Sequence, residues 1–270
     1  MSFFKQFPKV NYDFRNTGTN QKMTDIYRSI RVLPTFLDQI SGYRFYEIAN
    51  GERPDIVSQR LYGTANYYWT FFVVNDFLHD GYRAWPMSQE QLAAYLAKQY
   101  EGYVITTNTI VRTNSDNIIT DHENSIAGRF QLGETITGAT SGASGTLTKK
   151  NIDMNQLVIQ NVTGNFIGNP DLVQNETESI IGATSDDNVS TYQAFKYIDA
   201  PYYYFLENDV NKKPVSNAVF VTGGTPQSDL AYQTYRDYEF ELNEQRSKIR
   251  YIDPNYIEQF VNDFEELLNE

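Results

Sequence analysis

A nearly continuous run of large apolar side chains, from Tyr67 to Val74, constrains the fold of this chain more than any other stretch. Apart from Thr70, every position in the run is Tyr, Trp, Phe or Val. A helix built from this sequence has no polar side to turn towards water, so it must be covered all round. We therefore expect this run to form the core of a domain.

The residues around this run, 43–87, predict the order strand, helix, helix, strand. The stretch begins with aromatic and β-branched residues that favour a strand, and Asn50 and Gly51 then supply turn chemistry. Pro54 suits the first turn of a helix, and Gly63 ends that helix. The apolar run then forms the second helix.

Several motifs in this region resemble the LysM module, a small βααβ fold that binds glycans. They are Tyr62-Gly63 after the first helix, Trp69 in the second, and Asn75-Asp76 after it. The RPDI sequence at 53–56 and the YGxxxYYW pattern at 62–69 look instead like the LysM-like core of a baseplate wedge subunit of large contractile-tailed phages. Three further segments are similar to that family: MTDIYRSI at Met23–Ile30, WPMSQEQ at Trp85–Gln91 and YEFELNEQRSKIRYI at Tyr238–Ile252.

This resemblance implies a structural virion protein of the phage tail baseplate that joins adjacent wedges during baseplate assembly. It implies multiple copies per particle, located in the virion after assembly in the host cytoplasm. The implied partners are other baseplate wedge proteins and subunits of the sheath-proximal ring. The resemblance implies neither an enzymatic activity nor a cofactor.

The LysM resemblance leaves open an alternative function, the binding of peptidoglycan or chitin glycans. In LysM modules the glycan lies against the loop after the first strand and the loop after the second helix. The first loop departs from the usual Gly-Asp-Thr turn of that family, because residues 51–55 are Gly-Glu-Arg-Pro-Asp. The residues that correspond to the glycan groove are Gly51, Glu52, Arg53, Pro54, Asn75 and Asp76.

The composition argues against several classes of partner and site. The net charge of −12 disfavours nucleic acid and anionic membranes, because both would repel the chain at long range. The absence of cysteine excludes disulfides, thiolate catalysis and thiolate metal sites. No segment approaches the run of about 20 apolar residues that spans a bilayer, so we expect a soluble, unexported protein.

A second domain is predicted from an abrupt change in composition. Residues 128–190 contain only two of the 40 aromatic residues but eight of the sixteen glycines. Within them, GETITGATSGASG at 133–145 recurs imperfectly as TESIIGATSDDNV at 177–189. Short Thr- and Ile-rich strands between Gly turns predict a small all-β unit in which the two repeats pair.

The predicted fold class is therefore α+β, with a LysM-like βααβ core, an N-terminal arm, additional helices and an inserted small all-β domain. The arm and a short helix occupy residues 1–42, and the LysM-like core with the following helix and strand occupies 43–127. The inserted all-β domain with its internal repeat spans 128–190. Residues 191–270 return to the main domain and end in C-terminal helices.

The two ends of the chain are predicted to bind partners. The N-terminal arm alternates aromatic and polar residues, and the last helix carries apolar residues at i, i+3, i+4 and i+7 with nothing after it to cover them. An apolar stripe left in water favours association. The predicted partner-binding residues are Phe3, Phe4, Phe7, Ile257, Phe260, Val261, Phe264, Leu267 and Leu268.

We predict no catalytic residue, no metal site and no cofactor. Of the two histidines, His79 lies in the loop after the core helix, where a structural or exposed role is expected. The cluster Asp121-His122-Glu123 resembles a metal ligand set only in composition, because consecutive residues do not share a face. The Gly223-Gly224-Thr225 sequence lacks the Lys-Ser/Thr of a phosphate-binding loop.

Overall fold

The fold is known from a computed structural model, which describes most of the chain. The described residues are 7–13, 16, 18–25, 42–107, 126–152, 154–168, 177–214, 220–221, 225–226 and 230–269. The chain divides into two compact units. Residues 1–91 with 241–270 form the first, called here the aromatic unit, and residues 92–240 form the second, called here the barrel unit.

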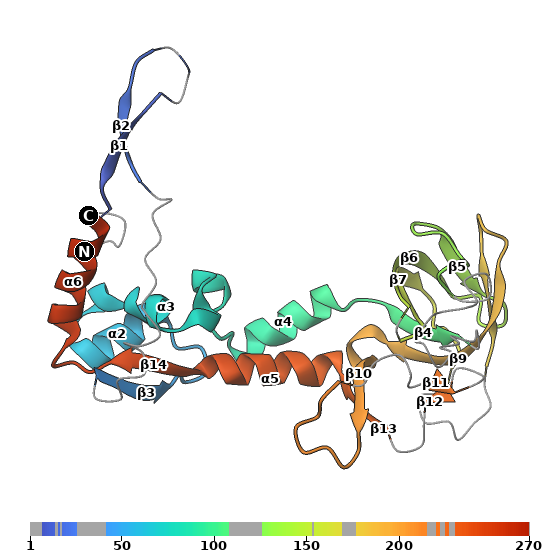
Figure 1. Ribbon diagram of the computed structural model, residues 1–270. Helices are drawn as coiled ribbons and strands as arrows, with labels where there is room; N and C mark the ends of the chain where they lie inside the picture. The colour runs from blue at the N-terminus through green and yellow to red at the C-terminus, as the bar shows by residue number, and fades with distance from the viewer. Residues whose placement is uncertain are drawn as a thin grey trace, which may run out of the picture. The chain divides into compact units, whose positions relative to one another are not determined.

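The elements of the aromatic unit come from both ends of the chain (Figure 1). They are β1 (Lys9–Tyr12), β2 (Gln21–Thr24), β3 (Tyr43–Glu47), α2 (Pro54–Tyr62), α3 (Thr70–Val74), β14 (Lys248–Ile252), α6 (Ile257–Asn269) and the 3₁₀ helices η3 (Ala65–Tyr67), η4 (Asp76–Leu78) and η5 (Gly81–Arg83). The chain leaves this unit within α4 (Gln89–Gln99) and returns to it within α5 (Tyr235–Ser247). The predicted capping box of α4 is formed, because the Ser88 hydroxyl accepts from the Gln91 N–H while the Gln91 side chain accepts from the Ser88 N–H.

The predicted LysM-like βααβ core is wrong at its last strand. Residues 75–87 contain the short 3₁₀ helices η4 and η5 and no strand. The partner of β3 is instead β14, which pairs with it antiparallel (Figure 1). The Trp85 indole N–H donates to the Glu52 carbonyl at 2.8 Å, which fixes residues near 85 against the loop before α2 instead of along β3. The strand that completes the sheet therefore comes from the distant C-terminal part of the chain.

The predicted α+β class is also wrong, because the described residues are mainly β. They contain fourteen strands and five α-helices, and six of the strands close one barrel. The apolar run, predicted to be a full helix, contributes little helix to the chain. That run forms only η3 and the five-residue helix α3. No helix among the described residues has the length and apolarity to cross a membrane.

The apolar run lies at the centre of the aromatic unit, as its composition predicts. Phe71 is fully buried with Trp85, Leu78 and Val57 in one cluster. Trp69 and Val74 belong to a second cluster, which α6 completes. α3 therefore has buried neighbours on two sides, which its lack of a polar face requires.

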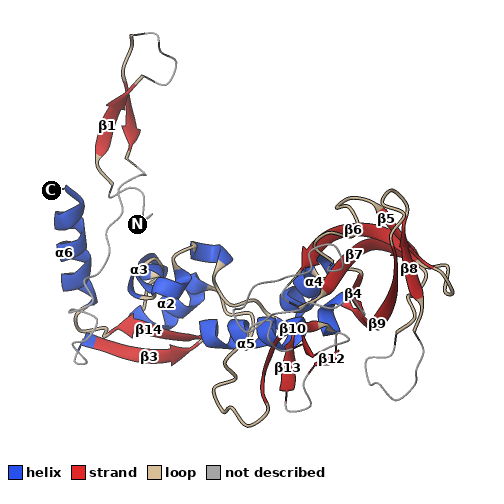
Figure 2. Cartoon of the chain, turned by 45° about the vertical axis from the view of Figure 1, so that its right-hand side comes forward, coloured by secondary structure: helices blue, strands red, loops and turns tan. Residues whose placement is uncertain are grey.

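The barrel unit is built around a closed antiparallel barrel with the strand order β4-β7-β6-β5-β8-β9 (Figure 2). Its strands are β4 (Tyr103–Thr107), β5 (Thr135–Gly138), β6 (Ser144–Asn151), β7 (Gln156–Thr163), β8 (Ser179–Gly182) and β9 (Asn188–Lys196). The remaining elements of this unit are η6 (Tyr197–Asp199), β10 (Pro201–Leu206), β11 (Phe220–Val221), β12 (Thr225–Pro226) and β13 (Leu230–Thr234), with β10 paired to β13 and β11 to β12. The interior of the barrel is aliphatic, with Ile105, Ile136, Leu147, Leu157, Ile159 and Ile180 fully buried.

The expected small inserted domain supplies only part of this barrel. Residues 128–190 contain β5 to β8, whereas β4 precedes them and β9 runs on to Lys196. β4 pairs with both β7 and β9, so the barrel cannot close without a strand that lies before the insert. The domain limits at 128 and 190 stay a prediction.

The two sequence repeats occupy equivalent places in the barrel. β5 and β8 belong to the first and second repeat and pair antiparallel around the central pair Thr137↔Ile181. Ile136 faces Gly182, and Ile180 correspondingly faces Gly138. Each repeat continues into the next strand, β6 or β9, so the repeats are related by a local two-fold axis between β5 and β8.

Candidate functional site

Helix α6 keeps most of its apolar stripe on the aromatic unit. Its buried stripe residues are Ile257, Phe260, Val261, Phe264 and Leu268, whereas 54% of Leu267 is exposed. The centroid of the Trp69 ring lies 4.7 Å from that of Phe264 and 6.4 Å from that of Phe260. Five of the six predicted partner-binding residues of α6 thus hold the helix to its own unit. Their assignment to a partner stays a prediction.

Asp253 fixes the chain where it enters α6. Its carboxylate accepts from the Asn255 backbone N–H at 2.9 Å and from the Arg44 Nε at 2.6 Å. Both contacts favour the ionised form, and together they lower the pKa of Asp253 below its ordinary value, the Asn255 N–H being the larger cause. The start of α6 is therefore tied to β3 through Arg44.

The N-terminal arm contains a hairpin with one apolar face. The register pairs Val10 with Met23 and Tyr12 with Gln21, so the apolar side chains of Val10, Tyr12 and Met23 share one face of the β1–β2 pair. All three are exposed. The opposite face carries Lys9 and Lys22. A two-stranded hairpin is only marginally stable alone in water, so this apolar face is a candidate contact surface.

The three predicted aromatic contacts of the arm are only partly described. Phe7 is buried in the same cluster as Phe260 and Phe264 of α6, which anchors the base of the arm on the aromatic unit. Phe3 and Phe4 lie outside the described residues. Their assignment to a partner surface stays a prediction.

In the predicted glycan groove, the two buried polar side chains already have partners. The Glu52 carboxylate accepts from the Tyr46 hydroxyl and the Ala49 N–H and forms an ion pair with Arg60. The Asn75 amide donates to the Phe71 and Arg250 carbonyls and accepts from the Arg250 N–H. A sugar hydroxyl would have to displace these contacts.

The other predicted groove residues serve the local backbone. Gly51 has a φ of +74°, which favours glycine, and Pro54 is buried in the first turn of α2. Arg53 pairs with Asp55 at the surface. Asp76 begins η4, and its carbonyl lies 2.8 Å from the His79 Nδ1.

Two buried glutamates, which sequence reasoning did not single out, join the barrel repeats. The Glu134 carboxylate of the first repeat accepts from the Thr184 N–H, the Ser185 N–H and the Ser185 hydroxyl of the second. The Glu178 carboxylate of the second repeat accepts from the same three groups at Thr140 and Ser141 of the first.

Each glutamate therefore satisfies the turn that follows the partner strand. The signal was present in the sequence, because Glu occupies the second position of both repeat copies and the GATS sequence follows in each.

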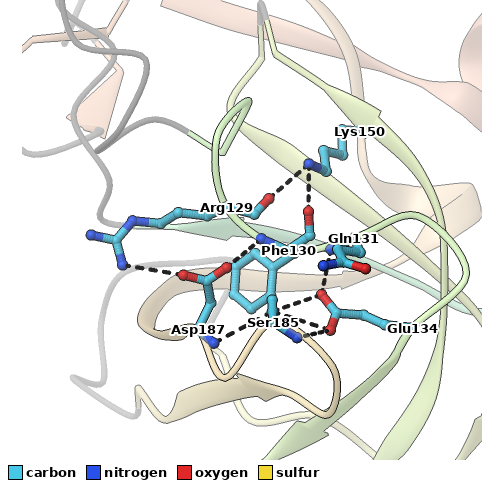
Figure 3. A network of polar contacts seen from close by, with 7 residues as sticks. All are labelled: Arg129, Phe130, Gln131, Glu134, Lys150, Ser185 and Asp187. Atoms are coloured by element: carbon cyan, nitrogen blue, oxygen red, sulfur yellow. Dashed lines mark hydrogen bonds and ion pairs between the residues drawn. The ribbon is translucent and has the colours of Figure 1, made fainter.

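A second polar network surrounds Phe130 in the barrel unit (Figure 3). Phe130 has a φ of +58°, which is unfavourable for a large residue, and its ring is buried in the barrel core. The Lys150 ammonium donates to the carbonyls of Arg129 and Phe130, and the Asp187 carboxylate accepts from the Phe130 N–H at 2.6 Å. These contacts, from Lys150 in β6 and from Asp187 in the turn before β9, hold the segment in its strained conformation.

The pKa values of Lys150 and Glu134 are both lowered, but for different physical reasons. Burial lowers the pKa of Lys150 below its usual value, although the nearby Glu134 and Asp187 carboxylates favour its charged form. Burial alone would raise the pKa of Glu134, but hydrogen bonds from Ser185, Gln131 and Thr184 outweigh it and lower the pKa. Both groups serve the fold of the barrel, because their partners are backbone groups and neighbouring turns.

The described residues offer no group of three or more His, Cys, Asp and Glu side chains that is arranged to hold a metal. His79 is exposed beside Asp80. The sequence cluster Asp121-His122-Glu123 lies outside the described residues.

Comparison with known proteins points to one kind of assembly. Residues 2–124 match the model of a family described as "Base plate wedge protein 53". A curated relative, the "Baseplate wedge protein gp53" of Enterobacteria phage T4, is 33% identical over 99 residues. These residues are 35% of this chain and 48% of the relative, so the chain spans about half the length of the curated relative that it matches.

The predicted resemblance to a baseplate wedge subunit of contractile-tailed phages is thereby confirmed. The family match includes the arm, the apolar run and α4 and ends before β5. Most of the barrel and the C-terminal elements β14 and α6 lie outside it.

Proposed function

We propose that this chain is a structural subunit of a phage tail baseplate, located in the wedge. The match of residues 2–124 to the wedge family carries this proposal. The site geometry supports it, because the notable features of the described chain are exposed apolar surfaces and structural networks. The role is not enzymatic.

Its finer role is to join adjacent wedges as the baseplate assembles. The partners are other wedge proteins and subunits of the sheath-proximal ring, and several copies enter each particle. Assembly takes place in the host cytoplasm, and the protein then stays in the tail baseplate of the virion. The hairpin face of Val10, Tyr12 and Met23 supports this role, because a partner that covers it removes apolar surface from water.

The arm hairpin and α6 are the proposed contact elements. The hairpin offers three exposed apolar side chains, and α6 offers Leu267, with the exposed acids Asp263 and Glu266 within one turn of it. Burying an apolar side chain contributes about 1.5–3 kcal/mol, so a few such contacts matter in a complex that is held together at many points.

The proposal is tested by mixing the purified chain with the other wedge components and following the joined complex by sedimentation. The change of Val10, Tyr12 and Met23 to Ser should prevent joining, while the melting temperature of the isolated chain stays nearly the same. A matched control changes Asn11, Lys22 and Thr24 on the opposite face to Ser. The wedge-joining role would be refuted if the apolar-face variant joined wedges as well as the original chain does. It would also be refuted if purified phage tails did not contain the chain.

A further inference from the structure

The β3–β14 sheet has two outer edges that differ in how they are covered. On the β14 edge, the Asn75 side chain accepts from the Arg250 N–H at 2.9 Å and donates to the Arg250 carbonyl at 2.9 Å. This amide occupies the place that a neighbouring strand would take. On the β3 edge, no described strand is paired.

The register identifies the backbone groups at the β3 edge. Phe45 lies opposite Arg250, whose N–H and carbonyl point away from β3 towards Asn75. The Ile48 N–H donates to Ser247 and the Asp253 N–H donates to Gly42, which continues the same alternation. In an antiparallel pair such alternation places the N–H and carbonyl groups of Phe45 and Glu47 on the outer edge.

The side chains at this edge present apolar surface and positive charge. Phe45 is 77% exposed, and the Arg250 guanidinium lies 5.9 Å from the centre of its ring. Arg44 and Arg60 are also largely exposed, at 59% and 58% of their side chains. The acids that pair with these two, Asp253 and Glu52, are only 10% and 5% exposed.

Among the described residues, Arg44, Arg60 and Arg250 are exposed on this sheet and on α2, whereas the chain as a whole carries −12. The exposed acid of β3 is Glu47, and it lies opposite the exposed Lys248 of β14. An exposed strand edge without proline is a template for another strand. Charge complementarity then selects the sign of that strand. The β1–β2 hairpin of a second copy is disfavoured, because it carries Lys9 and Lys22.

We propose that the outer edge of β3, at Phe45 and Glu47, binds an extended acidic segment of a partner protein as an added β-strand. Main-chain hydrogen bonds supply the attachment, and the arginines together with the Phe45 ring supply the selectivity for acidic and apolar side chains in alternation. This inference stands apart from the baseplate role, because it concerns a local recognition mode that peptides test without any wedge protein.

The first test is residue-resolved amide hydrogen exchange of the full chain. In the free protein the amides of Arg44 and Tyr46 should exchange slowly and those of Phe45 and Glu47 fast. Addition of a capped peptide of about eight alternating Glu and Val residues, a usual strand length, should slow the exchange at Phe45 and Glu47. A peptide of alternating Lys and Val should not. Unchanged exchange with the acidic peptide at millimolar concentration, or equal protection by both peptides, would overturn the proposal.

The second test uses a matched pair of variants. Glu47→Pro removes an outward N–H and leaves the β14 ladder and the Phe45 ring in place, whereas Glu47→Ala removes only the side chain. The acidic peptide should bind at least about tenfold more weakly to the proline variant, a difference of about 1.4 kcal/mol, and with unchanged or greater affinity to the alanine variant. Equal affinity of the acidic peptide for the proline and alanine variants would contradict strand addition. If the proline variant does not fold, the hydrogen-exchange experiment on the original chain decides the question. If the Phe45 and Glu47 amides were protected from exchange in the free protein because two copies associate, the edge would bind a second copy and not an acidic partner segment.

Discussion

The two units of this protein fill their hydrophobic cores with different kinds of side chain. The aromatic unit has two two-stranded sheets and short helices, and its buried residues include Trp69, Phe71 and Trp85. The barrel unit has a closed sheet whose interior is mostly Ile and Leu. Short elements bury enough surface only if each side chain is large, whereas a barrel of six strands has a narrow interior that aliphatic side chains fill.

The units also differ in where their stabilising contacts come from. In the barrel, the glutamates Glu134 and Glu178 join two repeats that are close in sequence. In the aromatic unit, β3 and the apolar run depend on β14 and α6 from the other end of the chain. The strands of the barrel therefore all come from one continuous part of the chain, whereas the aromatic unit is complete only when segments from both ends of the chain have come together.

Removal of residues 248–270 should have the largest effect on the stability difference between the two units. The truncation deletes the partner strand of β3 and all the core residues of α6, so the aromatic unit should lose its cooperative unfolding. The barrel should still unfold as one transition, because none of its strands is removed. Calorimetry of the truncated and full chains checks this, and a surviving transition of the aromatic unit would show that β14 and α6 are dispensable.

A single substitution within α6 should also destabilise the aromatic unit, but by less than the truncation does. Phe264→Ala removes a buried ring that contacts Trp69 and should lower the free energy of unfolding of the aromatic unit by about 3–5 kcal/mol. Leu267→Ala on the exposed side of the same helix should change it by less than about 0.5 kcal/mol. Denaturant titrations of the two variants measure the difference. Equal effects would mean that α6 does not pack as described.

In the barrel, the reciprocal glutamates should have comparable effects on stability. Glu178→Ala leaves the Thr140 and Ser141 N–H groups without their acceptor, and Glu134→Ala does the same at Thr184 and Ser185. Each change should cost about 1–3 kcal/mol. Glu101→Ala, at an exposed position, is the control. Urea unfolding of the barrel follows the loss, and a large effect from only one glutamate would argue against the two-fold relation.

The pH dependence of the barrel sharpens this prediction. The pKa of Glu134 is lower in the folded chain than in the unfolded chain, so its contribution is fully present above the unfolded value of about 4.3. The contribution is lost as the pH falls through the folded pKa. Between about pH 6 and pH 3, the original chain should therefore lose more barrel stability than Glu134→Gln does. If the free energy of unfolding of the barrel fell equally with pH in both chains, the charge of the Glu134 carboxylate would not contribute to barrel stability.

The smallest expected effect concerns the glycan alternative in the aromatic unit. Glu52 and Asn75 are engaged internally, so chitin oligomers and peptidoglycan fragments should give no saturable heat in calorimetry. A dissociation constant near micromolar, about −8 kcal/mol, would restore the alternative. Arg53→Ala is then the decisive variant, because Arg53 is exposed and its removal leaves the internal contacts of Glu52 and Asn75 in place.

The sequence by itself determined the features that depend on neighbouring residues. It placed the apolar run in the core, because a helix without a polar side cannot face water. It gave the capping box of α4 through Ser88 and Gln91, and it revealed the barrel repeats through their shared GATS turns. The amphipathic stripe of α6 was also evident, although its spacing does not say which surface the stripe covers.

The tertiary structure alone decided how distant segments pair. Strand propensity marks β3 as a strand but contains no information about its partner, which proved to be β14 rather than a nearby segment. The same holds for β4, which closes the barrel between β7 and β9, and for each glutamate that binds the turn of the other repeat. Local periodicity reports which face of an element is buried, whereas its partner is chosen by the complementarity of surfaces that meet only when the chain has folded.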